Sequence, residues 1–202
     1  MGAVLMMRYT STITIGGLKL AESRIVADLL LRGVSPDAWQ EAIEQKNILQ
    51  ARNIVSAKIT ARLVRERLKT MDADVWKMVR DGKGSVPTQA VFACALKHSK
   101  LLTDFVLLIV ADQYRLFSPT LPRNQWAKFL EGCRERDPVM PLWTEATCRR
   151  LRSSIFQCLA QAGYIDTTKD CRLQKVHIAP QVLAYLRSHN EAEVLKAMQV
   201  GP

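Results

Sequence analysis

Hydrophobic residues recur along most of this chain at the three- and four-residue spacing of an amphipathic helix. No long stretch alternates between apolar and polar residues, as a half-buried strand would. The spacing predicts helices near residues 18–32, 36–47, 50–69, 72–80, 86–98, 100–117, 123–136, 144–162 and 180–188. An extended segment is predicted at 9–15, where Thr and Ile alternate before Gly16-Gly17. The fold class is therefore predicted to be all-α, a multi-helix globular protein with helix-turn-helix elements.

The predicted helix 50–69 has two apolar faces. Its main apolar set follows the spacing of a core-facing stripe and consists of Ile54, Ala57, Ala61, Val64 and Leu68. A second apolar set consists of Val55, Ile59 and Leu63 and lies on the other side of a row of cations. These cations are expected either in a groove between packed neighbours or extended over those neighbours, and the sequence leaves both arrangements open.

The row of cations on this helix is the basic stripe, which consists of Lys58, Arg62, Arg65 and Lys69. Because each residue turns the helix by about 100°, the four side chains point within roughly 60° of one another. Only Glu66 is acidic between Lys58 and Lys69, whereas a face that serves solubility usually mixes its charges to gain ion pairs. The stripe predicts contact with a polyanion such as DNA. An acidic partner protein and a plain solvated surface are the alternatives.

The net charge supports an anionic partner. The chain of 202 residues has a formal charge of +10, and residues 51–100 hold eleven Lys/Arg against four Asp/Glu, a local balance of +7. A concentrated surplus indicates a binding surface more strongly than scattered charges do. RNA is less favoured than duplex DNA, because the predicted basic helix contains no aromatic residue on which an unpaired base could stack.

A second basic region lies in the carboxyl-terminal part of the chain. A helix at 144–162 ends at Gly163, a short return segment follows, and another helix begins at Pro180. This order is typical of a winged helix-turn-helix with at most a short hairpin, in which the helix before the wing enters the major groove and the wing contacts the backbone. Six basic residues belong to this layout: Arg149, Arg150, Arg152, Lys169, Arg172 and Lys175.

The best candidate for a domain boundary is the segment 118–122, since Pro119 and Pro122 both resist a helix. We therefore expect an N-terminal helical domain at 1–118, which contains the basic third helix. A winged-helix-like helical domain is expected at 119–202.

Membrane insertion is not expected. The most apolar stretch, 105–111, is seven residues long between Asp104 and Asp112, whereas a spanning helix needs about 20 apolar residues. The amino terminus has no basic region before its apolar residues, so a signal peptide is not expected. The five cysteines form no CxxC pair, and their odd number favours reduced thiols and a cytoplasmic location.

No motif in the chain favours catalysis. Nucleophile elbows, zinc-protease signatures, P-loops and dinucleotide-binding loops are absent from the sequence. Cys94 and His98 have the i, i+4 spacing of a metal-binding pair, but no second pair with ligand spacing lies nearby. A core thiol and an imidazole at a helix end are the favoured interpretation. We therefore expect a protein that is not an enzyme and that holds no metal or cofactor.

Three strings resemble proteins of the BrxA family, which are small core proteins of BREX bacteriophage-exclusion systems. The strings are residues 9–18 followed by Glu22-Ser23, residues 47–52 before the basic helix, and residues 163–166 after the arginine-rich helix. The similar length extends the resemblance to the whole chain. It implies a monomeric all-α protein with helix-turn-helix elements that binds double-stranded DNA. It also implies work beside a DNA methyltransferase and other BREX proteins in host methylation and phage restriction.

The resulting hypothesis is a non-catalytic DNA-binding accessory protein that contacts mainly phosphates. The alternative is an interaction module whose basic face docks an acidic partner protein. The family resemblance transfers no contact residues, so the predicted DNA contacts rest on charge geometry alone. They are Lys58, Arg62, Arg65, Lys69, Arg149, Arg150, Arg152, Lys169, Arg172 and Lys175.

Overall fold

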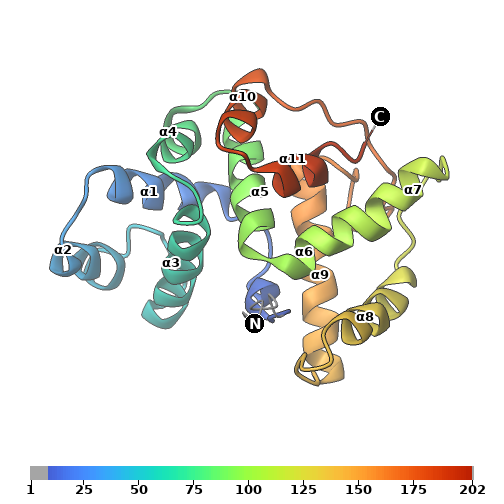
Figure 1. The fold of residues 1–202 in the computed structure, drawn as a ribbon. Helices are drawn as coiled ribbons and strands as arrows, with labels where there is room; N and C mark the ends of the chain where they lie inside the picture. The colour runs from blue at the N-terminus through green and yellow to red at the C-terminus, as the bar shows by residue number, and fades with distance from the viewer. Residues whose placement is uncertain (1–8, 202) are drawn as a thin grey trace, which may run out of the picture. The chain divides into compact units, whose positions relative to one another are not determined.

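The computed structural model describes residues 9–201, and within this range the chain is helical (Figure 1). The described residues form no sheet, and their β-pairing consists of two isolated bridges, Thr120 with Arg172 and Ile165 with Leu173. The prediction of an all-α fold is confirmed.

Contacts between residues group the chain into two compact units. Unit 2 consists of Leu18–His98 and Ile178–Glu191, and unit 1 contains the described residues of Met1–Gly17, Ser99–His177 and Ala192–Pro202. Each unit draws segments from both sides of residue 118. The division into separate domains at 1–118 and 119–202 stays a prediction.

Unit 2 is a bundle of helices around one apolar core. Its elements are α1 (Leu20–Leu31), α2 (Pro36–Gln40), the π-helical turn η2 (Glu41–Gln45), α3 (Ile54–Leu68), α4 (Ala73–Asp81), α5 (Val86–His98) and α10 (Pro180–Ser188). α1 packs against α3 and α4, and α5 packs against α3, α4 and α10. Val26, Val64 and Phe92 are among the fully buried side chains of this core.

Local signals place the first helices of unit 2 close to their predicted positions. Ser35 caps α2 by accepting a hydrogen bond from the backbone N–H of Ala38 over 3.2 Å, and Pro36 follows at the first helical position. Gly33, at a φ of +58°, follows α1, as predicted for a helix stop.

α3 begins at Ile54 rather than at the predicted Gln50. The reason is that the Asn47 side chain donates to the Ala51 carbonyl over 2.9 Å and accepts from the Ala51 backbone N–H over 3.0 Å, which holds the preceding segment in a turn. Asn53 then caps the helix. The predicted burial of Ile54 is wrong, since this side chain at the first position of α3 is 55% exposed.

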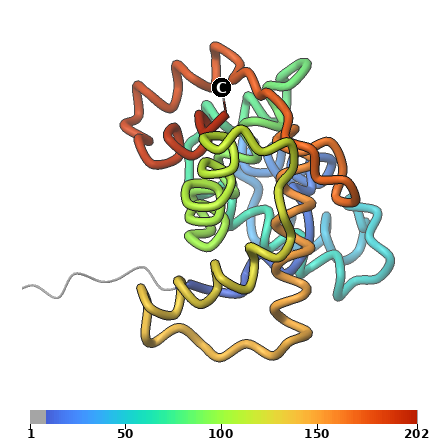
Figure 2. The backbone as a smooth tube through the Cα atoms, turned by 90° about the vertical axis from the view of Figure 1, so that its right-hand side faces the viewer, coloured from blue at the N-terminus to red at the C-terminus, as the bar shows by residue number. Residues whose placement is uncertain are grey.

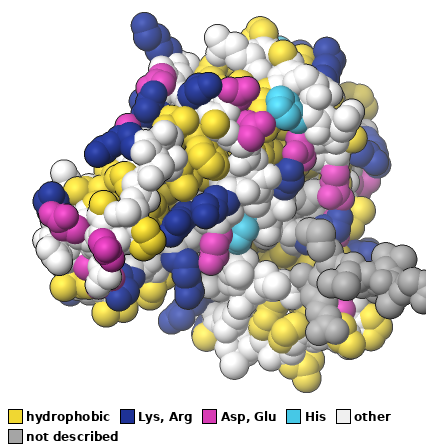
Figure 3. All heavy atoms as spheres, turned by 60° about the vertical axis from the view of Figure 1, so that its left-hand side comes forward, with side chains coloured by type: hydrophobic (Ala, Val, Ile, Leu, Met, Phe, Trp, Pro, Cys, Tyr) yellow, Lys and Arg dark blue, Asp and Glu magenta, His cyan; other side chains and the backbone are white. Residues whose placement is uncertain are grey.

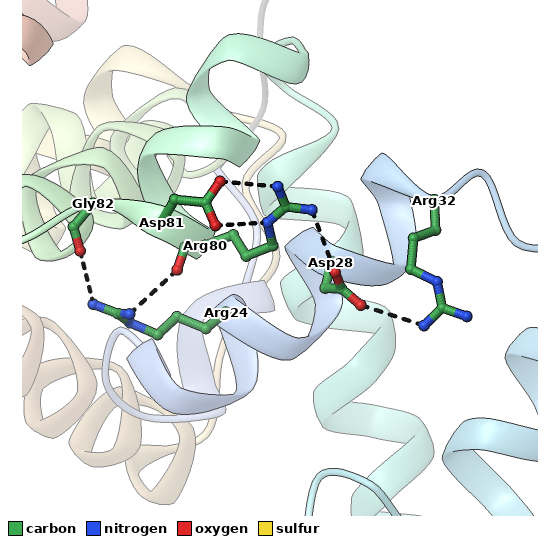
Figure 4. A network of polar contacts seen from close by, with 6 residues as sticks. All are labelled: Arg24, Asp28, Arg32, Arg80, Asp81 and Gly82. Carbon is green, nitrogen blue, oxygen red and sulfur yellow. Dashed lines mark hydrogen bonds and ion pairs between the residues drawn. The ribbon is translucent and has the colours of Figure 1, made fainter.

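A network of charged side chains joins α1 to α4 (Figure 4). Arg80 on α4 lies 3.3 Å from Asp28 on α1 and also binds Asp81. Arg24 donates to the backbone carbonyls of Arg80 and Gly82, each over 3.2 Å. The hydrogen bonds from Arg80 hold the pKa of Asp81 below its ordinary value. These contacts orient the two helices over their shared apolar face.

Unit 1 contains a long helical rod and three further helices. Its elements are the 3₁₀ turn η1 (Thr12–Thr14), α6 (Lys100–Phe105), the π-helical turn η3 (Val106–Val110), α7 (Ala111–Arg115), α8 (Gln125–Arg136), α9 (Glu145–Ala162) and α11 (Ala192–Met198). α6, η3 and α7 follow one another without a break (Figure 1). Figure 2 follows the chain from α8 through residues 137–144 into α9.

Aromatic rings form the centre of unit 1. The ring centroid of Phe105 lies 5.7 Å from Trp126, 5.1 Å from Phe129 and 5.8 Å from Phe156. Phe105, Val106, Val110 and Ala111 of the apolar run 105–111 are buried in this core, whereas Leu108 is 46% exposed. Within the described residues, no helix is both long and apolar enough to cross a bilayer.

The predicted extended segment at 9–15 is wrong. Thr14 donates its backbone N–H to Ser11 over 3.1 Å, which closes the 3₁₀ turn η1, and the Ile13 side chain is buried at 1% exposure. η1 packs against α9. The alternation of Thr and Ile thus reflects one buried side chain in a tight turn rather than a strand.

Candidate nucleic-acid interface

α9 presents one face to the core of unit 1 and another to solvent. Thr144 caps its amino terminus, and Gly163, at a φ of +84°, ends it as predicted. Leu151, Ile155 and Leu159 are fully buried on the core side. Arg149 and Arg150 are exposed and Arg152 is half-buried. The helix therefore directs its three predicted arginines away from the core.

Two hollows lie side by side along this outer face and share Ser153 and Gln157. We call them together the α9 surface. The first, of about 450 Å³, is lined by Thr14, Gly16, Ala146, Arg149, Arg150, Ser153, Ser154 and Gln157. The second, of about 270 Å³, is lined by Arg123, Arg152, Ser153, Phe156, Gln157 and Thr168. None of these lining residues is acidic.

The arginines of the α9 surface are largely free of carboxylates. Arg149 lies 3.3 Å from Glu145, but both side chains are well exposed, so solvent screens this pair. Within the part of the chain that the structure describes, no ion pair joins Arg123, Arg150 or Arg152 to a carboxylate. The surface is therefore strongly positive.

Arg123 was not among the predicted site residues. Its guanidinium carbon lies 5.9 Å from the centroid of the Phe156 ring, a cation–π arrangement at the edge of the second hollow. Arg123 comes from the segment before α8, and its only sequence signal is a basic residue directly after Pro122. Sequence periodicity could not place it beside α9, because the contact is made between distant segments.

The segment after α9 forms a tight loop. The Thr167 hydroxyl accepts hydrogen bonds from the backbone N–H groups of Lys169 and Asp170. The Asp166 carboxylate accepts from the backbone N–H of Arg172 over 2.9 Å. Leu173 then donates to the carbonyl of Pro119 over 3.1 Å. This segment forms isolated bridges where a short hairpin was predicted, and the winged-helix assignment stays a prediction. The three basic residues of the segment, Lys169, Arg172 and Lys175, are exposed.

Gly16 and Gly17 allow the N-terminal segment to pass close to α9. A Cβ on Gly16 would lie 2.6 Å from the Gln157 amide oxygen, and one on Gly17 would lie 2.8 Å from that of Gln161. Gly17 also has a φ of +76°, which side chains disfavour. This close approach brings Thr14 to the first hollow, so the Gly-Gly pair helps to shape the α9 surface.

The basic stripe of α3 belongs to unit 2. Lys58 lies 3.0 Å from Glu44, and the guanidinium of Arg65 lies over the Trp39 ring, 4.5 Å from its centroid. Arg62 is 74% exposed and Lys69 is also exposed. Of the two arrangements that the sequence left open, the structure shows a groove, since Lys58, Arg62 and Arg65 line one. Contact of the stripe with DNA stays a prediction.

The candidate metal pair has the surroundings of a protein core. Burial raises the pKa of the Cys94 thiol to about 12, which disfavours the thiolate that a metal requires. Burial and the nearby Arg67 lower the pKa of His98. No group of three metal-binding side chains occurs among the described residues.

These features define a small, basic, all-α protein with an arginine-rich helical surface. Its sequence is matched over residues 7–190 by the BrxA family model. The chain belongs to the BrxA family.

Similar proteins support this assignment over more than nine-tenths of the chain. The BREX protein BrxA of Paramagnetospirillum magneticum is 49% identical over 194 residues, which cover 96% of this chain and 98% of that protein. The BREX protein BrxA of Escherichia coli O9:H4 is 32% identical over 184 residues, 91% of this chain and 86% of that protein. A crystal structure of an uncharacterized protein from Magnetospirillum magneticum superimposes with a TM-score of 0.90 and has 48% sequence identity. The match covers 96% of this chain and 100% of that protein's chain.

Proposed function

We propose that this chain binds double-stranded DNA as a non-catalytic accessory protein of a BREX phage-defence system. Membership of the BrxA family supports the role in phage defence, because the relatives at 49% and 32% identity are named as BREX proteins. The proposed setting is the cytoplasm, with the chain a monomer and with other proteins of the same system, such as a DNA methyltransferase, as partners.

The observation that carries the proposal is the lining of the α9 surface. Its two hollows combine four arginines with serine and threonine hydroxyls and one glutamine amide, and none of the lining residues is acidic. Arginine, hydroxyl and amide groups are the common donors to phosphate oxygens in protein–DNA complexes. α9 and the segments beside it thus bring several phosphate donors together on one surface.

Three more cations of unit 1 follow α9 along the chain and are further candidates for DNA contact. Lys169, Arg172 and Lys175 follow α9 in the exposed loop and its return segment. We assign them to backbone contacts, while Arg150 and Arg152 are the candidates for base edges because a guanidinium can pair with guanine. The α3 stripe stays a separate prediction, since Glu44 already neutralises part of the charge of Lys58.

Fluorescence anisotropy with a labelled 20-base-pair duplex of random sequence tests the proposal. Phosphate-dominated binding should give a Kd of about 10⁻⁴ to 10⁻⁶ M near physiological salt, and it should tighten steeply as salt falls. Unlabelled duplex DNA should displace the probe at lower concentration than duplex or single-stranded RNA. Absence of binding at low salt, or stronger displacement by RNA, would contradict the proposal.

A further inference from the structure

A hollow larger than either hollow of the α9 surface lies in unit 2, between the α2–η2 segment and α3. It is a groove of about 550 Å³ lined by Trp39, Ile43, Glu44, Val55, Lys58, Ile59, Ala61, Arg62 and Arg65. Figure 3 brings the side of the molecule that carries α1 to α4 forward and shows apolar side chains exposed beside Lys and Arg side chains. We call this hollow the α2–α3 groove. It shares no residue with the α9 surface.

Apolar side chains of the groove are exposed to solvent. Val55 is 66% exposed and Ile59 is 39% exposed, although both occupy helical positions where polar residues would serve solubility. Exposed apolar area next to a concave surface is typical of a site that another molecule covers, because covering it removes that area from water. Trp39 adds an aromatic side chain of the kind that anchors protein interfaces.

The rim of the groove is positive. Lys58, Arg62 and Arg65 line it, and Glu44 is the one carboxylate among its lining residues. Glu44 lies 3.0 Å from Lys58, whereas Arg62 lies 3.9 Å from Glu66, at the outer limit of an ion pair. Two guanidinium groups of the rim are therefore available to carboxylates from another molecule.

Arg65 is the second guanidinium of the rim, and an aromatic ring holds it in place. Its Nε is buried and has no hydrogen-bond acceptor among the described residues, while its guanidinium lies 4.5 Å from the centroid of the Trp39 ring. A carboxylate bound at this edge of the groove would supply charge complementarity at a guanidinium that the ring already holds in place.

We propose that the α2–α3 groove docks an acidic amphipathic segment of a partner protein. Large apolar side chains of that segment enter the groove against Trp39, Val55 and Ile59, and its Asp or Glu side chains bind Arg62 and Arg65. A DNA duplex fits less well, because its charged phosphate backbone would not bury the exposed apolar side chains of the groove. A second copy of this chain is disfavoured by a net charge of +10 on each copy.

Selection from a display library of random 16-residue peptides on the immobilised full-length chain tests the proposal. Enriched peptides should combine at least one large apolar residue with flanking Asp or Glu. Their affinity is then measured by fluorescence anisotropy. Ile59→Ser should weaken binding about tenfold, because an exposed apolar side chain that lines the groove is removed. Ile54→Ser is the matched control, since Ile54 is exposed on the same helix but does not line the groove, and it should change affinity less than about twofold.

Two further measurements separate charge and folding from the apolar contact. Arg62→Gln changes an exposed side chain, so it should leave the fold intact, weaken the selected peptides and reduce their salt dependence. Unlabelled 20-base-pair duplex DNA should not displace them. The proposal is overturned if no peptide is enriched, if enriched peptides lack acidic residues, if Ile59→Ser and Arg62→Gln both bind as wild type, or if the duplex competes. The DNA-binding assay probes the α9 surface, which shares no residue with this groove. A negative result with the peptides therefore does not contradict DNA binding at α9.

Discussion

The phenol of Tyr9 donates a hydrogen bond to Oδ2 of Asp104 over 2.5 Å, between residues 95 positions apart. Nε of Arg136 donates to the same phenol oxygen over 3.1 Å, and Lys100 lies 2.9 Å from the other oxygen of Asp104. Burial raises the pKa of Tyr9 above its ordinary value, so the phenol keeps its proton. The hydrogen bond ties the start of the described chain to α6.

Tyr9→Phe should therefore lower the free energy of unfolding by roughly 1–3 kcal/mol, because the buried carboxylate of Asp104 loses a donor. Urea denaturation monitored by circular dichroism measures the change. Asp104→Asn and the double variant complete a thermodynamic cycle, and the two single effects should not add. Full additivity would mean that the hydrogen bond does not couple the two residues.

Gly17→Ala in unit 1 should be more destabilising than Gly33→Ala in unit 2, although both glycines have a positive φ. Gly33 is the control, since it has a φ of +58° and a Cβ there would meet no atom within 4 Å. Gly33→Ala should lower the free energy of unfolding by about 1 kcal/mol, from backbone strain alone. Gly17→Ala adds a steric clash with the Gln161 side chain and should lower the free energy of unfolding by roughly 2–3 kcal/mol. Equal effects in urea denaturation would show that Gln161 moves aside freely.

Sequence reasoning predicted the parts of the fold that local signals determine. The helix-start residues Ser35 and Pro36, the stop at Gly163 and the span of α10 are all found as predicted. The 3₁₀ turn η1 was missed because its stability comes from burial of Ile13 and packing on α9, which alternation cannot reveal. The helix α11 was not predicted.

The same limit applies to the candidate site. Arg149, Arg150 and Arg152 could be predicted, because helical spacing places them off the buried face of α9. Their partners in the hollows could not, since Thr14, Arg123 and Thr168 arrive from distant segments. For the α3 stripe, charge counting could not show that Glu44 lies against Lys58 or that Trp39 lies against Arg65.

The pH dependence of stability should contain a contribution from His98. Burial and Arg67 lower its pKa in the folded chain below the ordinary 6.5, and this outweighs the opposing effect of Glu66. The unfolded chain then binds more protons near this pH, so the contribution is present above about pH 6.5 and is lost as pH falls below it. His98→Gln should reduce the loss of unfolding free energy between pH 7.5 and 5.5. An unchanged pH profile in urea denaturation would contradict the assignment.

Thiol reactivity should distinguish Cys148 from the other four cysteines. Cys94, Cys133, Cys158 and Cys171 are buried, whereas Cys148 is half-buried. Burial raises the pKa of Cys94 to about 12 and also raises that of Cys133, so their reactive thiolates are disfavoured. A colorimetric disulfide reagent should modify one thiol of the native chain quickly, and Cys148→Ser should abolish this phase. A second fast thiol would show that the native core opens.

The slope of log K against log salt concentration, measured with duplex DNA, tests the α9 proposal most directly. Replacing Arg123, Arg150 and Arg152 with Gln should reduce the slope by about 0.9 for each phosphate that the variant no longer neutralises. Replacing Arg115, Lys128 and Arg134, which are exposed cations of unit 1 outside the α9 surface, removes the same charge and should leave the slope close to wild type. The pair Arg62→Gln and Lys69→Gln tests the α3 prediction in the same titration. A slope unchanged by removal of the three α9-surface arginines, or reduced equally by the matched control, would contradict DNA binding at α9.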